Sequence, residues 1–294
     1  MEGHLFDEGF LSDLDALQMR FSTAVNNLYS GGRRSKMHGS TVEFANFREY
    51  IQGDDFRRID WNAYGRFEKF FIKLFLDEKQ LQTNIFIDTS ASMDFGTPTK
   101  LEAALKIGAA FAYVSMCASD RVSVCAVADG NAARISTGTG GKAAFYGLLD
   151  RLEQITPSGQ TGLCGALRGF TGLTGNAGAS VLITDFMSGD DYREVLKFLV
   201  YNKQQTVLVH ILSPEEMHPE LEGMIRLVDS ETGGYCEIDA NRRTLDTYMQ
   251  ALADYTSEIR EYCLKAGIYY LPVCSDESID TVIMEKGTAA GIFC

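Results

Sequence analysis

The chain has 294 residues, 45% of them hydrophobic, which suits one large or two modest domains with an extensive core. Its 40 Asp and Glu outnumber its 27 Lys and Arg, and the resulting charge of -13 argues against a nucleic-acid-binding surface. Seven scattered cysteines without a Cys-x-x-Cys pair indicate reduced thiols. The start is acidic and no long apolar span follows, so we expect a cytoplasmic protein that does not insert into membranes.

The first 80 residues form an N-terminal segment with an amphipathic start, a basic loop and a strand-like stretch at residues 71–76. Residues 81–294 form a second domain in which strands and helices alternate, which predicts an α/β fold with a mostly parallel, Rossmann-like sheet flanked by helices. We expect its strands at residues 85–87, 120–127, 180–184, 206–212 and 268–273, and its helices at 100–119, 143–155 and 192–203.

An insertion at about residues 213–243 interrupts this alternation. Strand-like residues 225–228 and 235–238 flank the sequence Asp-Ser-Glu-Thr-Gly-Gly, which is typical of a hairpin with a glycine turn. A helix is predicted next, at residues 243–266, ending at Gly267. We expect its apolar stripe to pack in the core; the stripe consists of Leu245, Tyr248, Met249, Leu252, Tyr255, Ile259 and Tyr262.

Oxygen-bearing side chains follow the first strand of the sheet. The sequence Asp88-Thr-Ser90-Ala-Ser92 places one carboxylate and two hydroxyls where the chain turns over, beyond the carboxyl end of the strand, which is where α/β sheets bind ligands. Side chains two residues apart in such a turn can face the same point, and a hard divalent cation prefers oxygen ligands. The structural alternative is that Asp88 and Ser90 only cap a helix or stabilise the turn.

Two later positions supply further oxygens, since Thr161 lies in a loop before a helix and Asp185 follows the strand at residues 180–184. In identity and order, the five residues resemble the metal-ion-dependent adhesion site (MIDAS) of von Willebrand factor A domains; they are Asp88, Ser90, Ser92, Thr161 and Asp185. The resemblance covers residues 81–294 in outline. It implies a von Willebrand factor A-like fold and a bound Mg²⁺, with Mn²⁺ or Ca²⁺ as alternatives, whose coordination is completed by an acidic group of a partner protein.

A dense block of alternating charges occupies residues 43–61, with a turn at Gly53-Asp54-Asp55. Taken alone, these charges are explained by a structural network of ion pairs. Followed by Asp88-Thr-Ser-Ala-Ser-Met, however, the block resembles the signature of the domain-of-unknown-function family fifty-eight along nearly the full chain. This second resemblance implies a MoxR-type AAA+ ATPase as partner, together with a client protein that the pair would assemble or activate.

The two resemblances together favour a non-catalytic, metal-dependent protein-binding module that acts as an adaptor of the ATPase. The alternative is a metal-dependent phosphohydrolase in which Asp88 would be the nucleophile. Phosphatases of the haloacid-dehalogenase type place a general-acid aspartate two positions after the nucleophile. That position is Ser90 here, and a serine hydroxyl cannot serve as an acid at neutral pH. We therefore expect no catalytic residues in this chain.

Overall fold

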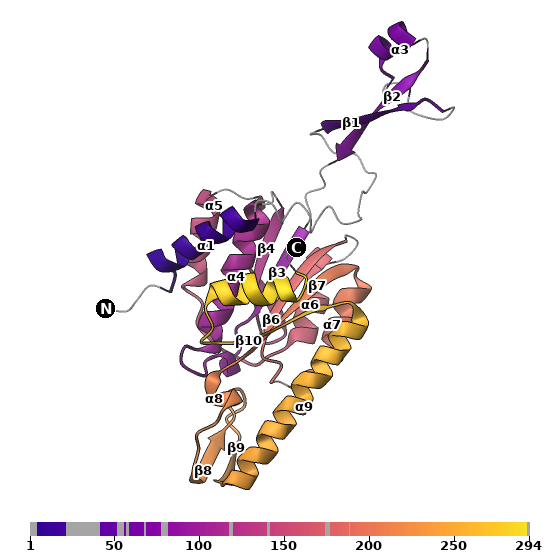
Figure 1. Cartoon of the computed structure of the whole chain (residues 1–294). Coiled ribbons are helices and arrows are strands. Elements are labelled where there is room, and N and C mark those ends of the chain that lie inside the picture. Colours follow the sequence, from indigo (N-terminus) through magenta and orange to yellow (C-terminus); the bar gives the residue numbers. More distant parts are fainter. Residues whose placement is uncertain are drawn as a thin grey trace. The chain divides into compact units, whose positions relative to one another are not determined.

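The computed structural model describes residues 5–21, 42–51, 56, 59–67, 69–77, 82–117, 120–139, 142–173, 177–187 and 189–292 (Figure 1). The chain divides into a larger unit, residues 1–29 and 81–294, and a smaller unit, residues 30–80. In the smaller unit β1 (Val42–Glu49) and β2 (Phe71–Asp77) pair antiparallel, and α3 (Trp61–Phe67) lies between them in sequence. The predicted Gly53-Asp54-Asp55 turn lies outside the described residues, as does the basic loop near residue 33.

The larger unit is built on a six-stranded sheet with the strand order β10-β7-β6-β3-β4-β5. Numbered along the chain within this sheet, the order is 6-5-4-1-2-3, that of a doubly wound α/β fold. All neighbouring strands are parallel except β4 and β5. This topology confirms the predicted α/β fold with a mostly parallel, Rossmann-like sheet. The strands are β3 (Gln82–Asp88), β4 (Arg121–Ala128), β5 (Asn131–Thr139), β6 (Gly178–Thr184), β7 (Gln204–Leu212) and β10 (Tyr269–Cys274).

Helices cover both faces of this sheet, because its central strands are apolar on both sides. In β3, Ile85 and Ile87 join the core on one face and Phe86 joins the core on the other, and all three are fully buried. The first face is covered by α1 (Glu8–Phe21), α4 (Lys100–Cys117), α5 (Lys142–Leu152) and the π-helical turn η4 (Thr281–Lys286), which continues into α10 (Gly287–Ala289). The second face is covered by α6 (Leu163–Gly169), α7 (Tyr192–Tyr201) and α9 (Arg242–Ala266).

Helix α1 belongs to the larger unit, although the sequence-based boundary at residue 80 assigned it to an N-terminal segment. Its buried residues Phe10, Leu14 and Leu17, together with Phe6 just before the helix, join the same core cluster as α4. The second stretch of the larger unit starts at Leu81, where the sequence places the start of the α/β domain. The apolar face of the amphipathic start of the chain therefore packs against α4, more than 60 residues further along the sequence.

Strand β5 was not predicted. It is an antiparallel edge strand, and its residues 131–136 are exposed or half-buried, so it lacks the apolar run by which the central strands were recognised. Two short 3-10 turns, η2 (Ala91–Met93) and η3 (Thr171–Leu173), complete the connections within the sheet. None of the helices in the described part of the chain combines the length and apolar character needed to cross a bilayer.

The predicted hairpin is present as β8 (Gly223–Val228) and β9 (Tyr235–Ala240), preceded by the short helix α8 (Pro214–Met217). Figure 1 shows the hairpin and the first half of α9 side by side beyond the sheet. Tyr248 and Met249 in this first half are 39% and 42% exposed, whereas Ile259 in the second half is fully buried against the sheet. The expectation that the whole apolar stripe of α9 packs in the core is therefore wrong.

Candidate metal site

Asp88, the last residue of β3, is fully buried at the switch point of the sheet. Strand β3 lies between β4 and β6, and the chain reaches β4 first and β6 only later, so the carboxyl end of β3 is where such sheets bind ligands. The register pairs Ile87 with Ile183, which places Asp88 beside Thr184. Asp185 follows directly, so both predicted carboxylates end neighbouring strands.

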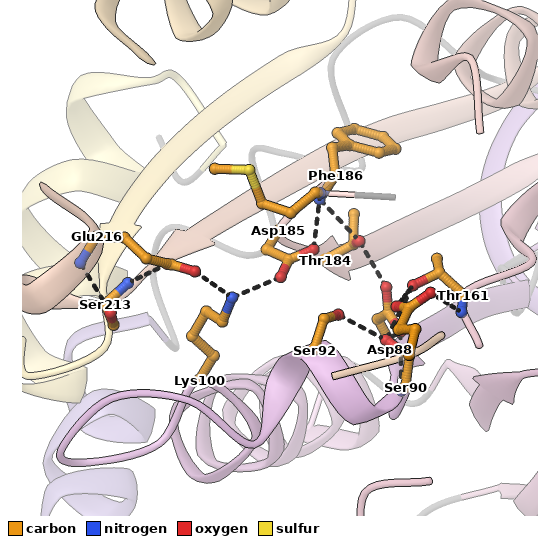
Figure 2. Close-up of polar contacts among 12 residues, drawn as sticks. Asp88, Ser90, Ser92, Lys100, Thr161, Thr184, Asp185, Phe186, Ser213 and Glu216 are labelled. Atoms are coloured by element: carbon orange, nitrogen blue, oxygen red, sulfur yellow. Dashed lines mark hydrogen bonds and ion pairs between the residues drawn. The ribbon is translucent and has the colours of Figure 1, made fainter. Parts of the chain in front are cut away.

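Three hydroxyl groups and the Asp88 carboxylate form one continuous set of contacts (Figure 2). Ser90 Oγ donates to Asp88 Oδ1 at 2.7 Å and lies 3.0 Å from Ser92 Oγ. Thr161 Oγ1 lies 3.0 Å from Ser90 Oγ. The other carboxylate oxygen of Asp88 accepts from Thr184 Oγ1 at 2.7 Å. The structure thus brings four of the five predicted residues together and adds Thr184.

Close backbone packing positions Thr161. Hydrogen bonds between main-chain atoms hold the loop at residues 158–162 to the turns that follow β3 and β4. Gly159 has a φ of 75°, and a Cβ atom at this residue would collide with the carboxylate of Asp129. A Cβ atom on Gly162 would collide with the backbone of the β4–β5 turn. These two glycines let the loop approach the strand ends closely enough for Thr161 to contact Ser90.

Asp185, the fifth predicted residue, is paired with a buried lysine (Figure 2). Lys100 Nζ, on a side chain only 1% exposed, lies 2.6 Å from Asp185 Oδ2 and 2.6 Å from Glu216 Oε1. Burial lowers the pKa of Lys100, but the carboxylates of Asp185 and Glu216 outweigh burial and raise that pKa above its usual value. The ammonium group therefore stays charged and forms a buried ion pair with the Asp185 carboxylate.

A neutral histidine supports the backbone at Asp185. His210 Nε2 lies 2.8 Å from Asp185 O, and Nδ1 lies 2.9 Å from Tyr270 Oη. A carbonyl oxygen only accepts, so Nε2 carries the proton and Nδ1 accepts from the tyrosine hydroxyl. Burial lowers the pKa of His210, which favours this neutral form. The imidazole thus fixes the main chain from which the Asp185 side chain extends.

The pKa of Asp88 is raised to about 6, first by burial and then by the nearby charge of Asp185. Hydrogen bonds from Ser90 and Thr184 lower it, but they do not outweigh burial. Keeping the buried Asp88 ionised at neutral pH therefore costs the folded protein free energy. A cation bound beside Asp88 would favour the ionised form and offset that cost.

A residue of the β8–β9 turn also reaches the cluster. Glu231 Oε1 lies 2.6 Å from Thr161 Oγ1, and Glu231 Oε2 accepts from Thr161 N at 3.1 Å. Each hydroxyl group has one proton to donate. Thr161 donates its proton to the carboxylate of Glu231, just as Ser90 donates its proton to Asp88. Ser90 Oγ also lies within hydrogen-bonding distance of Thr161 Oγ1, at 3.0 Å.

This donor set fits a small divalent cation. Neighbouring oxygen ligands of an octahedral Mg²⁺ lie about 3 Å apart, and the hydroxyl oxygens of Ser90, Ser92 and Thr161 have this spacing along their chain of contacts. Together with Asp88 they are the residues that would hold the ion. Across the residues that the structure describes, His, Cys, Asp and Glu side chains form no metal-binding group of three or more, so a metal here would depend on hydroxyl ligands.

Sequence reasoning missed three contributors to the site: Lys100, Thr184 and Glu231. Lys100 opens the apolar helix α4, and a charged residue that begins a mostly buried helix just after the Asp88 turn is a signal that could have identified it. Thr184 directly precedes the predicted Asp185. Glu231 lies in a turn that the sequence identified correctly, but the position of a hairpin tip relative to the sheet is set by tertiary packing.

A family model described as "Protein of unknown function DUF58" matches residues 46–258 of the chain. Two uncharacterized proteins, one from Mycobacterium bovis and one from Mycobacterium tuberculosis, are each 22% identical to it over 281 residues. Each alignment covers 94% of this chain and 88% of the relative. The similarity to these relatives therefore extends over nearly the whole chain.

Among solved structures, the chain is similar to BatB from Bacteroides thetaiotaomicron, with 19% identity and a TM-score of 0.43. An aerotolerance-related membrane protein from Bacteroides fragilis has 18% identity and a TM-score of 0.44; both alignments cover 72% of this chain and 99% of the other. A von Willebrand factor type A protein from Catenulispora acidiphila has 13% identity and a TM-score of 0.33, over 48% of this chain and 35% of that one.

Proposed function

The chain belongs to the DUF58 family, and from this membership and the geometry of its site we propose that it is a non-catalytic protein-binding module. In this proposal the oxygen cluster at the end of β3 binds Mg²⁺, and the bound ion accepts a carboxylate from a partner protein. The ion would supply an electrophilic anchor for that carboxylate, while the chain's own residues fix the position of the ion.

One observation carries the proposal: a buried carboxylate and three hydroxyls from two separate loops meet at the switch point of the sheet. Hydroxyl ligands are neutral, so an ion held by them and by Asp88 retains positive charge for an external acidic group. Asp185, already neutralised by Lys100, leaves that charge largely uncompensated. A partner's Asp or Glu side chain matches such a site in charge and in ligand type.

The buried state of Asp88 supports a binding role over the phosphohydrolase alternative. A carboxylate nucleophile needs an accessible oxygen, whereas Asp88 is fully buried and both of its oxygens accept hydrogen bonds, from Ser90 and from Thr184. The position two residues further along is Ser90, whose own proton is donated to Asp88. The arrangement therefore orients Asp88 as a fixed negative charge.

For the partner we propose a MoxR-type AAA+ ATPase, and with it a client protein that the pair assembles or activates in the cytoplasm. This part of the proposal rests on the family resemblance in the charged block at residues 43–61 and in the Asp88 motif. In this proposal the site attaches the chain to its partner, because a carboxylate of the partner binds the metal ion. The adaptor role requires that partner binding depend on the metal.

Titration calorimetry of the chain with the ATPase in Mg²⁺, and again in excess EDTA, tests this proposal. We expect binding in Mg²⁺ and at least about a tenfold loss in EDTA, in line with the effect of losing a metal ligand or its support. Asp88→Ala and Ser92→Ala should both reproduce the EDTA result. Asp150→Ala, which removes an exposed carboxylate on α5, is the matched control and should bind like the wild type.

Thermal melting of each variant in EDTA shows whether it has kept its fold. Equal binding of the wild type in Mg²⁺ and in EDTA would sink the metal-bridge proposal, as would full binding by the folded Ser92→Ala variant. Turnover of phosphate esters by the wild type, lost in Asp88→Ala, would favour the phosphohydrolase instead.

A further inference from the structure

The β8–β9 turn is organised around one side chain. Asp229 Oδ1 accepts from Glu231 N at 2.9 Å and from Thr232 N at 3.3 Å, and Asp229 N donates to Gly234 O at 2.7 Å. Gly233 has a φ of 70°, which closes the turn at little steric cost. Glu231 is half-buried, while the residues on either side of it are exposed. The turn therefore holds Glu231 in place before any ligand arrives.

Both carboxylate oxygens of Glu231 contact one residue of the candidate metal site. Oε1 accepts from the Thr161 hydroxyl at 2.6 Å and Oε2 accepts from the Thr161 amide at 3.1 Å. The strands of the hairpin are mostly exposed, with only Ile225, Ile238 and Ala240 less so. The tip is thus anchored to the site by a paired, charge-assisted contact rather than by apolar packing.

The charged groups around the site differ between the side of Lys100 and the side of Glu231. Lys100 lies between Asp185 and Glu216 and offsets negative charge on that side. On the other side, Asp88 and Glu231 flank the hydroxyl cluster with no protein cation in contact with either among the contacts that the structure describes. Two such carboxylates offer a divalent cation two negative charges and the oxygen ligands that it prefers.

We propose that Glu231 is an internal acidic ligand of the site: its carboxylate takes the place that the partner's carboxylate takes in the bound state. This inference rests on the proposed function and adds regulation to it. A partner must displace the hairpin tip before its own carboxylate reaches the metal. The apparent affinity for the partner is therefore reduced by the fraction of molecules in which the tip is engaged.

Calorimetry with Mg²⁺ alone tests the inference without any partner. Glu231→Gln keeps the size of the side chain and removes its charge, so we expect Mg²⁺ affinity to fall by roughly tenfold or more, the range seen when a supporting partner of a metal ligand is lost. Glu222→Gln, an exposed glutamate just before β8, is the matched control and should leave Mg²⁺ affinity unchanged. Asp88→Asn should not bind Mg²⁺, so its titration gives the background signal of the calorimetry.

Hydrogen exchange of the turn gives a second readout. We expect Mg²⁺ to slow amide exchange at residues 229–234 in the wild type and in Glu222→Gln, but not in Glu231→Gln. The reason is that the ion stabilises the turn only by binding the Glu231 carboxylate. Equal Mg²⁺ affinity of Glu231→Gln and wild type, with a turn that does not respond to Mg²⁺, would overturn the internal ligand and leave the proposed function standing. A wild type that binds no Mg²⁺ would overturn both.

Discussion

At the scale of single residues, the buried carboxylate of Asp88 makes the metal-free protein sensitive to pH. Its pKa is raised from 3.8 to about 6, chiefly by burial. Well below pH 3.8 the group is protonated in both the folded and the unfolded chain, so its burial carries no charge penalty. As the pH rises through about 6, the folded chain must keep a buried charge that the unfolded chain keeps in water. This contribution to stability is therefore present at low pH and lost as the pH rises.

We predict that, in EDTA, the free energy of unfolding of the wild type falls relative to Asp88→Asn between pH 4 and pH 7. Two pKa units correspond to a relative loss of about 3 kcal/mol. Urea unfolding of both proteins across this pH range measures the difference, and other titrating groups such as His210 cancel in it. Added Mg²⁺ should restore the wild type at pH 7 and leave Asp88→Asn unchanged. Parallel stability curves for the two proteins would contradict the burial of a charged Asp88.

At the scale of elements, the loop that carries Thr161 depends on its close approach to the β4–β5 turn. Gly162 has no side chain, and a Cβ atom there would meet the backbone of Gly130. We predict that Gly162→Ala displaces the loop, destabilises the fold by about 1–3 kcal/mol as overpacking does, and weakens Mg²⁺ binding because Thr161 moves away from Ser90. Thermal melting and calorimetry with Mg²⁺ measure the two effects.

Gly147→Ala is the control for this loop, since a Cβ atom at Gly147 on α5 has nothing within 4 Å. Alanine in a helix is more stable than glycine by roughly 0.5–1 kcal/mol, so this variant should melt at the same or a higher temperature and bind Mg²⁺ normally. Normal Mg²⁺ affinity in Gly162→Ala would show that the close approach of the loop does not position Thr161.

Elements also show what the sequence could and could not predict. The central strands carry apolar runs on both faces, so their order along the chain and the oxygens at their carboxyl ends were predictable, and Asp88, Ser90, Ser92 and Thr161 do come together. Strand β5 lacks such a run. The pairing of Asp185 with Lys100, across 85 residues, and the contact of Glu231 with Thr161, across 70, depend on tertiary packing that no local pattern reports.

At the scale of the whole molecule, the larger unit is completed by a helix from the start of the chain. Leu14 on α1 is 1% exposed and shares a core cluster with α4, which follows the Asp88 turn. We predict that Leu14→Ala lowers the stability of the larger unit by about 2–5 kcal/mol, the usual cost of a large-to-small change in a core. Because α4 begins with Lys100, a loosened α4 would also disturb its ion pair with Asp185.

Urea unfolding monitored by circular dichroism checks this prediction, with Ser12→Ala as control because Ser12 is exposed on the same helix. The control should unfold within about 0.5 kcal/mol of the wild type, as surface substitutions usually do. If Leu14→Ala unfolded like Ser12→Ala, α1 would be a peripheral element and the α/β core would be complete from residue 81 onward. A large loss in Leu14→Ala alone would show that the candidate metal site is supported by a fold whose first helix precedes the smaller unit in the chain.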